Sequence, residues 1–557
     1  MRKFNRSLPL ALTLASCIGL GLMPSRAQAQ ARAATPQAQH TQVDEAPLRA
    51  HLALLASDLF EGRGTGQRGG DLTVAYLETQ VQALGLQPGN KQSKSYRQAV
   101  QLIGVSTLLD QSQLIVKAAQ QQKPALPLSF GTDWVFSTGN GQTLNVFEDA
   151  ELVFAGYGIT APEEGNWDDF KGLDVRGKIL IVLANDPYPT EAEPNRFGGK
   201  AMTIYGRRGY KYEEALRRGA KGVLVIHTEA STQTSWPVVS QGALAEQFQL
   251  AGKEPGLALQ GWLSEGAAQK LFAAAGLDLA QQRAAAEGRD FKPQSLALKL
   301  SGKLAARSRA LQQDNIAALV PGTDPQLKDE LLIYSAHWDH LGKQLQGDKT
   351  VIFNGAVDNA SGSAALLAMA QAAVRQPARR SQMFLWVAAE EQGLLGSAWY
   401  AAHPLWPLAK TAAALNLDTL NFVGRTRDIG AHGAERSNLD TVVAGVAEHM
   451  GLSVAPPRID TGGYYFRSDH FSFARAGVPA FSVSSGSQYL GDAESLAAKR
   501  RAYGARYHQA SDTYDPSWDL SGMREQAQYT LNLGRAIADA DALPAWKPGD
   551  PFAAVKR

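Results

Sequence analysis

From about residue 314 onward, short apolar segments alternate with helical segments, and the apolar segments are followed by acidic or histidine residues. The stretch 361–375 shows the clearest helical pattern in this part of the chain. The expected strands are 316–320, 331–336, 382–389, 412–417 and 480–484. Strands that alternate with helices are typical of an α/β domain with helices on both faces of one sheet. This alternation therefore predicts the fold class of the second half of the chain.

The polar residues at the strand ends predict a metal-dependent hydrolase. His337, Glu390 and Asp418 each follow an expected strand directly, whereas Asp358 precedes a helix and His508 lies on a late loop. In an open α/β sheet, ligands bind beyond the carboxyl ends of the strands, so these residues converge on one edge. Imidazole and carboxylate groups without cysteine suit two zinc ions that share a carboxylate. Two such ions can activate a water and polarise a carbonyl, which indicates hydrolysis of peptide bonds.

Several of these residues also allow a structural interpretation. Asp358 alone would be interpreted as a helix N-cap, but in this company we expect a bridging carboxylate. Successive residues of an extended segment point to opposite sides, so one of Glu390 and Glu391 can bind metal while the other faces the water. Asp339 follows His337 by two residues, and we expect it to orient that imidazole.

For three further residues near these motifs we expect a structural role. We expect no direct metal contact from His340, or from the Asp469-His470 pair, which could pack internally or form a wall of the site.

The N-terminus has the pattern of a secretory signal peptide. A basic start is followed by the apolar run 8–23 and by a small-x-small cleavage site at 27–29. We therefore expect export to the periplasm or the extracellular space. The sequence around Cys17 resembles a bacterial lipobox, but the apolar run continues past it, so lipid anchoring is the less favoured alternative.

The composition excludes several other classes. Cys17 is the only cysteine, so loss of the leader leaves no thiol for catalysis or for metal binding. Loss of the four basic residues of the leader also changes the formal charge from +2 to −2, which argues against a nucleic-acid partner. After the leader, no apolar run is long enough to span a bilayer.

A chain of 557 residues predicts two or three domains. The stretch 146–300 mixes apolar strands with short helices and predicts a small α/β domain of its own. The GxGxxG pattern at 64–69 follows a helix and not a strand, so we expect a turn between helices and no dinucleotide site.

Six motifs together resemble the secreted di-zinc aminopeptidases. In chain order they are HWDHLG, GAVDNASGSAALL, AAEEQGLLGS, LNLDTLN, RSDHFSFARAGVPAF and YHQASDTYD, and they cover about 314–540. The early segment HLALLASDLFEGRGTG is similar to the helical lead-in of that family, and 146–300 resembles its inserted protease-associated domain. The resemblance implies a zinc-exopeptidase three-layer fold with a mixed, mostly parallel central sheet. The expected parts are a signal peptide (1–29), an early peptidase part (30–145), the insert (146–300), the main peptidase part (301–545) and a tail (546–557).

The resemblance also implies a role for each residue of the site. Glu390 would be the general base, Tyr507 would help to stabilise the oxyanion, and Arg467 would contact the substrate. The five implied zinc ligands are His337, Asp358 as the bridge, Glu391, Asp418 and His508. The implied activity is removal of N-terminal residues from peptides with a free amine. A carboxypeptidase or a glutaminyl cyclase on the same scaffold, or an inactive binding protein, stays open as an alternative, although the complete ligand set disfavours the cyclase and the binding protein.

Overall fold

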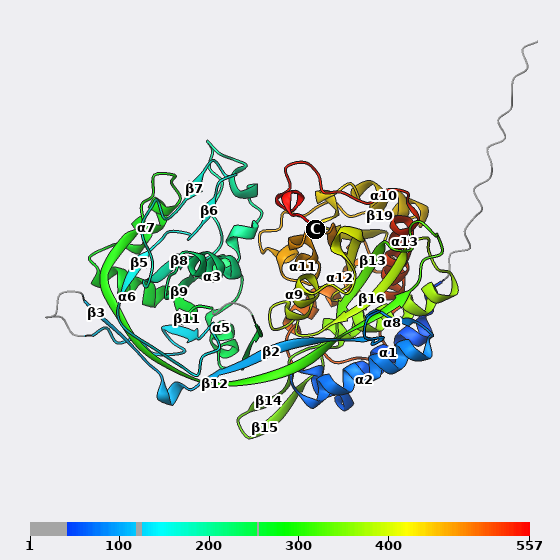
Figure 1. Ribbon diagram of the computed structural model, residues 1–557, viewed down its shortest axis with the longest axis horizontal. Coiled ribbons are helices and arrows are strands. Elements are labelled where there is room, and N and C mark those ends of the chain that lie inside the picture. The colour runs from blue at the N-terminus through cyan, green and yellow to red at the C-terminus, as the bar shows by residue number, and fades with distance from the viewer. Residues whose placement is uncertain (1–41, 119–124, 253–255) are drawn as a thin grey trace, which may run out of the picture. The chain divides into compact units, whose positions relative to one another are not determined.

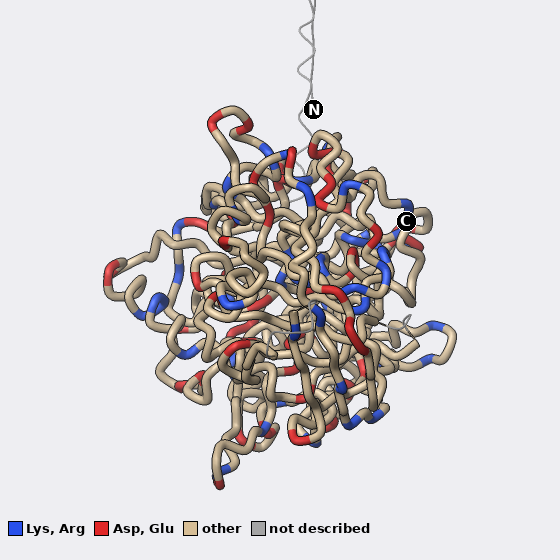
Figure 2. The backbone as a smooth tube through the Cα atoms, turned by 90° about the vertical axis from the view of Figure 1, so that its left-hand side faces the viewer, with Lys and Arg blue, Asp and Glu red and all other residues tan. Residues whose placement is uncertain are grey.

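The computed structural model describes residues 42–118, 125–252 and 256–557 (Figure 1). The predicted signal peptide and the possible lipobox lie outside these residues. Among the described residues, no helix combines the length and the apolar character that crossing a bilayer requires. In Figure 2, basic and acidic residues are intermixed along the chain, as the near-balance of 55 Lys and Arg against 53 Asp and Glu requires.

The central sheet is mixed and mostly parallel around its middle, as the sequence predicted. Strands β13 (Leu331–His337), β16 (Ser381–Val387), β17 (Thr411–Asn416) and β20 (Ala480–Ser485) lie in the order β20-β17-β13-β16 and pair in parallel. The antiparallel β12 (Gln294–Val320) and β18 (Asp428–His432) follow on the two sides. Every residue of β13, β16 and β17 is buried, because helices cover both faces of a parallel sheet.

Helices on both faces complete a three-layer arrangement. On one face, Leu332 and Tyr334 pack in a core with residues of α1 (Glu45–Leu55), α8 (Ser361–Arg375) and α13 (Ser521–Asp539). On the other face, Ile333 and Leu385 pack with residues of α9 (Leu395–Ala402) and α11 (His470–Arg475). Figure 1 shows α1 beside α8 and, on the other side of the sheet, α9 near α11. Successive side chains of β13 point to opposite faces of the sheet and therefore contribute to two separate cores.

The long strand β12 joins this sheet to a second one (Figure 1). Its first half pairs with β3 (Gln113–Ala118) and β5 (Leu144–Phe154), and its second half pairs with β2 (Arg97–Thr107) and β16. The sequence predicted a strand only over 316–320. The prediction was too short because the segment 307–313 is mostly polar and partly exposed. Backbone pairing with β2 holds this segment extended. Backbone hydrogen bonds do not require apolar side chains, so the sequence shows no alternation of apolar and polar residues here.

The second sheet has hydrophobic cores of its own. Its parallel strands are β5, β8 (Ile179–Leu183), β9 (Gly222–His227) and β11 (Leu259–Ser264), and β4 (Trp134–Ser137) pairs with β11 at the edge. Both β3 and β4 precede residue 146, so paired strands of this sheet begin before the boundary that the sequence suggested. The limits of the inserted domain stay a prediction.

The GxGxxG pattern lies between helices, as predicted. The 3-10 helix Asp58–Arg63 precedes it and α2 (Arg68–Ala83) begins within it. A Cβ atom on Gly69 would overlap the Phe60 carbonyl oxygen, so this glycine permits close packing of the two helical segments.

Close packing of α13 against the central sheet generates a first prediction. Gly534 of α13 lies directly over Tyr334 of β13, and a Cβ atom there would overlap the tyrosine hydroxyl. We expect Gly534→Ala to destabilise the protein by about 1–3 kcal/mol through overpacking, as measured by urea denaturation. Gly445 of α10 (Asp440–His449) has open space around it, so Gly445→Ala is the control and should stabilise the helix by about 0.5–1 kcal/mol. Equal stability of the two variants would contradict this packing.

Candidate metal centre

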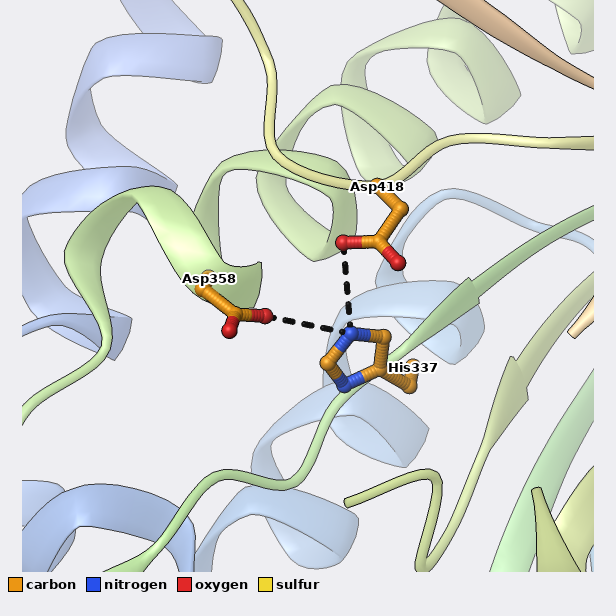
Figure 3. A group of neighbouring side chains, drawn as sticks. All are labelled: His337, Asp358 and Asp418. Carbon is orange, nitrogen blue, oxygen red and sulfur yellow. Dashed lines mark ion pairs between the residues drawn. The ribbon is translucent and has the colours of Figure 1, made fainter. Parts of the chain in front are cut away.

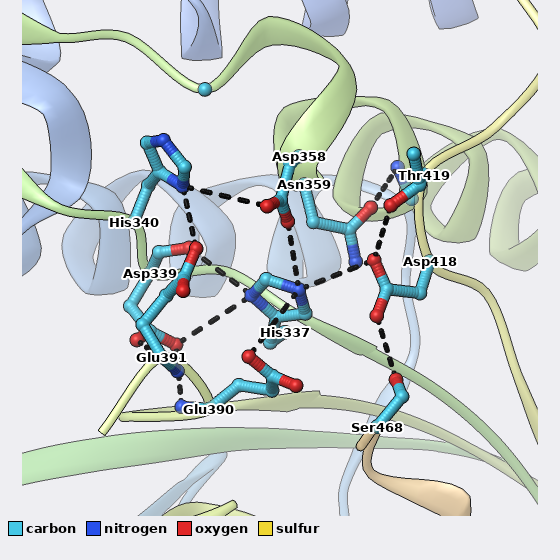
Figure 4. A network of polar contacts seen from close by, with 12 residues as sticks. His337, Asp339, His340, Asp358, Asn359, Glu390, Glu391, Asp418, Thr419 and Ser468 are labelled. Carbon is cyan, nitrogen blue, oxygen red and sulfur yellow. Dashed lines mark hydrogen bonds and ion pairs between the residues drawn. The ribbon is translucent and has the colours of Figure 1, made fainter. Parts of the chain in front are cut away.

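The strand ends bring the predicted residues together at one edge of the central sheet. His337 is the last residue of β13, the Glu390-Glu391 pair follows β16, and Asp418 follows β17. Because these three strands are parallel neighbours, their carboxyl ends meet. Asp358 lies in the turn before α8 and points into the same space (Figure 4). The convergence expected from the sequence is therefore present in the structure.

A first group of ligand atoms surrounds the buried His337 imidazole. Its Nε2 atom lies 3.4 Å from Asp358 Oδ1 and 3.5 Å from Asp418 Oδ1 (Figure 3), and 4.0 Å from Glu390 Oε2. Its Nδ1 atom is closer to the backbone carbonyl of Asp339, at 3.2 Å, than to the Asp339 carboxylate, at 3.8 Å. That carboxylate instead accepts hydrogen bonds from the Glu390 and Glu391 backbone N–H groups, at 3.0 and 3.3 Å. Asp339 therefore positions the glutamate pair as well as lying beside His337.

A second group lies on the other side of Asp358. Asp358 Oδ2 and Glu391 Oε2 are each 3.1 Å from His508 Nε2. His340, from which we expected no direct metal contact, also lies here. Its Nδ1 atom is 2.7 Å from Glu391 Oε1 and 4.0 Å from Asp358 Oδ2. The two oxygens of Asp358 thus face different histidines, as a bridging carboxylate requires.

The donor set fits metal ions. The Nε2 atoms of His337 and His508 are buried and face carboxylate oxygens, and neither has a hydrogen-bond partner among the described residues. A buried polar atom without a partner is costly, and a cation bound to the lone pair of each imidazole would remove that cost. Two groups of three possible ligands share Asp358. The first adds His337 and Asp418, and the second adds Glu391 and His340. His508 also lies against Asp358 and Glu391. Three nitrogen and oxygen ligands per ion leave an open position, as catalytic zinc sites do.

The pKa values of the two adjacent glutamates are shifted in opposite directions. Burial raises the pKa of Glu390 well above its usual value, against the opposing effect of His337. Burial and Asp358 also act to raise the pKa of Glu391, but His508 and His340 outweigh them and lower it to about 2. Burial raises the pKa of Asp339 to about 6. Of the pair, Glu390 therefore binds a proton more readily than Glu391.

The two residues assigned to substrate and oxyanion lie at the edge of the site. The Tyr507 ring is 42% exposed and stacks on the His508 ring, with 3.9 Å between their centroids. Arg467 is exposed, and its guanidinium lies over the Tyr464 ring at 5.3 Å. The neighbouring Ser468 donates a hydrogen bond of 2.6 Å to Asp418 (Figure 4), so Arg467 is next in sequence to a residue that contacts the first group.

The Asp469-His470 pair is fully buried behind the site, and its histidine packs against Tyr465 with 4.8 Å between the ring centroids. Burial of this kind is compatible with both roles that the sequence left open, internal packing and a wall of the site.

Sequence reasoning missed three polar residues that support the ligand segments. Thr65 donates to the Asp339 carboxylate at 3.4 Å, while Arg63 and Asp512 bind the turn that carries Asp358. Asp512 lies in the YHQASDTYD motif, which was the one available signal. Arg63 and Thr65 lie in the glycine-rich segment, where nothing marks them as neighbours of a site more than 270 residues away in sequence.

The chain is similar to known peptidases in sequence and in fold. Residues 315–532 match the model of peptidase family M28. Leucine aminopeptidase 1 of Trichophyton rubrum is 29% identical over 196 residues, which are 33% of this chain and 51% of that protein. Leupeptin-inactivating enzyme 1 of Streptomyces exfoliatus is 32% identical over 241 residues, 42% of this chain and 48% of that protein. The chain thus spans about half the length of the curated relatives it matches. An aminopeptidase from Aneurinibacillus sp. strain AM-1 shares the fold, with a TM-score of 0.50, 19% identity and coverage of 92% of this chain and 98% of that one.

The two histidines of the second group lead to a prediction about metal content. His508 Nε2 faces both Asp358 and Glu391, so we expect His508→Phe to bind about one zinc ion fewer than the wild-type protein. Atomic absorption on dialysed protein would measure this. His403 is exposed and stacks on Trp399, so His403→Phe serves as a control with unchanged zinc content. Loss of an ion from His340→Phe but not from His508→Phe would transfer the ligand role to His340.

Proposed function

We propose, on the premise that residues 315–532 belong to peptidase family M28, that this protein is a zinc aminopeptidase that removes N-terminal residues from peptides. The observation that carries the proposal is the position of Asp358, whose two oxygens face the Nε2 atoms of His337 and His508. The curated relatives named aminopeptidases support the same class. We also retain the expectation that the leader exports the protein.

The residues that would hold two zinc ions divide into two sets. His337, Asp358 and Asp418 would hold one ion, and Asp358, Glu391 and His508 would hold the other. When bound, the ions supply a water of lowered pKa and positive charge for the substrate carbonyl oxygen.

Glu390 would move the proton. Its carboxylate lies beside the first group, 4.0 Å from His337 Nε2, and its buried position raises its pKa. It would take a proton from the attacking water and give it to the leaving amine nitrogen, as a general base and then a general acid. The Asp339 carboxylate accepts a hydrogen bond from the Glu390 backbone N–H and so fixes the backbone from which the Glu390 side chain extends.

Other residues would bind the substrate. The carboxylates at the centre would attract a free α-amino group, which favours cleavage at the N-terminus. The Tyr507 hydroxyl would stabilise the oxyanion, and Arg467 would contact the substrate, because both lie at the exposed edge of the site.

The second sheet would limit access to the site, as a protease-associated insert. Two contacts support this: Arg475 of α11 pairs with Glu213 of α3 (Arg208–Arg217) at 3.0 Å, and the Met202 backbone N–H donates to the Asp460 carbonyl at 2.8 Å. These contacts bring the insert against segments on both sides of Arg467, at Asp460 and at Arg475.

A peptide assay tests the proposed activity. The protein is incubated with one pool of peptides, half with free and half with acetylated N-termini, and the products are identified by mass spectrometry. We expect loss of single N-terminal residues from the free peptides only. Trimming at the C-terminus, or cyclisation of N-terminal glutamine, would instead indicate a different enzyme on the same scaffold.

The role of Glu390 gives a separate prediction. Glu390→Gln keeps the size of the side chain but removes the proton acceptor, so we expect kcat to fall by about 10²–10⁴-fold with zinc content unchanged. Steady-state kinetics and atomic absorption measure the two quantities. Glu494→Gln on the exposed helix α12 (Ala493–Ala502) is the control and should leave both unchanged. Near-normal kcat in Glu390→Gln would show that another group accepts the proton.

A further inference from the structure

Two buried side chains of opposite charge bind the backbone of the turn 354–358, which ends in Asp358. Arg63 is fully buried and takes the carbonyl side of the turn: Nη1 donates to Asn354 O at 2.7 Å and Nη2 donates to Gly355 O at 2.8 Å. Its Nε atom donates to Trp338 O at 2.8 Å, in the segment that directly follows His337. One guanidinium therefore connects two ligand segments.

Asp512 takes the amide side of the same turn and is also fully buried. Its carboxylate accepts from Val357 N, which is 3.2 Å from both oxygens, and from Asp358 N, which is 3.2 Å from Oδ2. Its backbone carbonyl accepts from Ala356 N at 3.0 Å. Three successive N–H groups of the turn thus end on one residue.

Asp512 also belongs to the loop that carries His508. It lies four residues after His508, and its backbone N–H donates to Gln509 O at 3.0 Å, which closes this short loop. The hydroxyl of Tyr503 donates to Asp512 Oδ2 at 3.2 Å from the other end of the loop. Asp512 therefore links the turn that carries Asp358 to the loop that carries His508.

We propose that Asp512 is a positioning residue for the metal centre: together with Arg63 it fixes the turn so that Asp358 presents one oxygen to His337 and the other to His508. The inference rests on the proposed function, because it assigns Asp512 to the same metal centre. Without the carboxylate, two buried N–H groups would lack an acceptor, and the turn would move to satisfy them. Such a movement would separate Asp358 from the two histidines.

The structure offers a matched control for the test. Asp428 is as deeply buried as Asp512 and binds backbone in the same way, because its carboxylate accepts from Ser487 N at 2.9 Å and Gln488 N at 2.8 Å. It lies in β18, outside the ligand segments. The variants Asp512→Asn and Asp428→Asn therefore make the same exchange, in which one acceptor oxygen stays and the other becomes an NH2 donor, at the candidate centre in the first variant and away from it in the second.

Zinc affinity and the stability of the metal-free protein are measured separately. Zinc affinity is obtained by competition with a chromophoric chelator, and the unfolding midpoint of the metal-free protein is obtained by circular dichroism. We expect both variants to lower the midpoint, but only Asp512→Asn to weaken zinc binding, by about 10- to 100-fold, as loss of an outer-sphere partner does. Wild-type zinc affinity in Asp512→Asn, or an equal loss of affinity in Asp428→Asn, would overturn the inference.

A second variant covers the case in which Asp512→Asn does not fold. Arg63→Lys keeps the charge but cannot reach the Asn354, Gly355 and Trp338 carbonyls together, so we expect the same selective loss of zinc affinity. Unchanged affinity in Arg63→Lys would then overturn the inference. A wild-type protein that binds no zinc would instead overturn the proposed function, so the two failures are distinguishable.

Discussion

Burial of several carboxylates at one edge of the sheet is the constraint on which the rest of this structure depends. Asp339, Asp358 and Glu391 are close neighbours, and taking ionised carboxylates out of water is expensive unless each has partners. The protein supplies those partners from the backbone and from three imidazoles, and Arg63 adds a buried positive charge. Burial lowers the pKa of Arg63 to about 10, but Asp512, Asp358, Asp339 and Glu391 all favour its charged form.

The fold places the candidate metal ligands at one edge of the central sheet. Parallel strands end at the same edge, so β13, β16 and β17 deliver one ligand segment each without any loop having to cross the sheet. The remaining ligands come from outside the strands and need separate support. The helical lead-in provides Arg63 and Thr65, and the late loop provides Asp512. Segments from both ends of the described chain are therefore required to form one centre.

Much of this was visible in the sequence for a clear physical reason. Apolar runs such as 331–336 must be buried strands, and a histidine or acid at the end of each run must lie at the sheet edge. The helix 361–375 was predicted with its observed limits, and it is buried on nearly all sides, as a helix rich in apolar residues is. The length of β12 was not predicted, since its middle is extended through pairing with β2 and carries polar side chains. His340 was expected to make no direct metal contact, because the sequence does not show that its ring faces Glu391.

The sequence by itself determined which residues could bind metal and which strands would carry them, because hydrophobic burial and strand direction are local properties. It also determined the class of chemistry, since imidazole and carboxylate side chains without thiols allow few alternatives. Only the tertiary structure decided how the ligand segments are held. Arg63 and Asp512 act on backbone groups of a turn that is 291 residues from Arg63 and 154 residues from Asp512. Hydrogen bonds to backbone atoms leave no mark on the partner's side chains, so no pattern in the sequence records them.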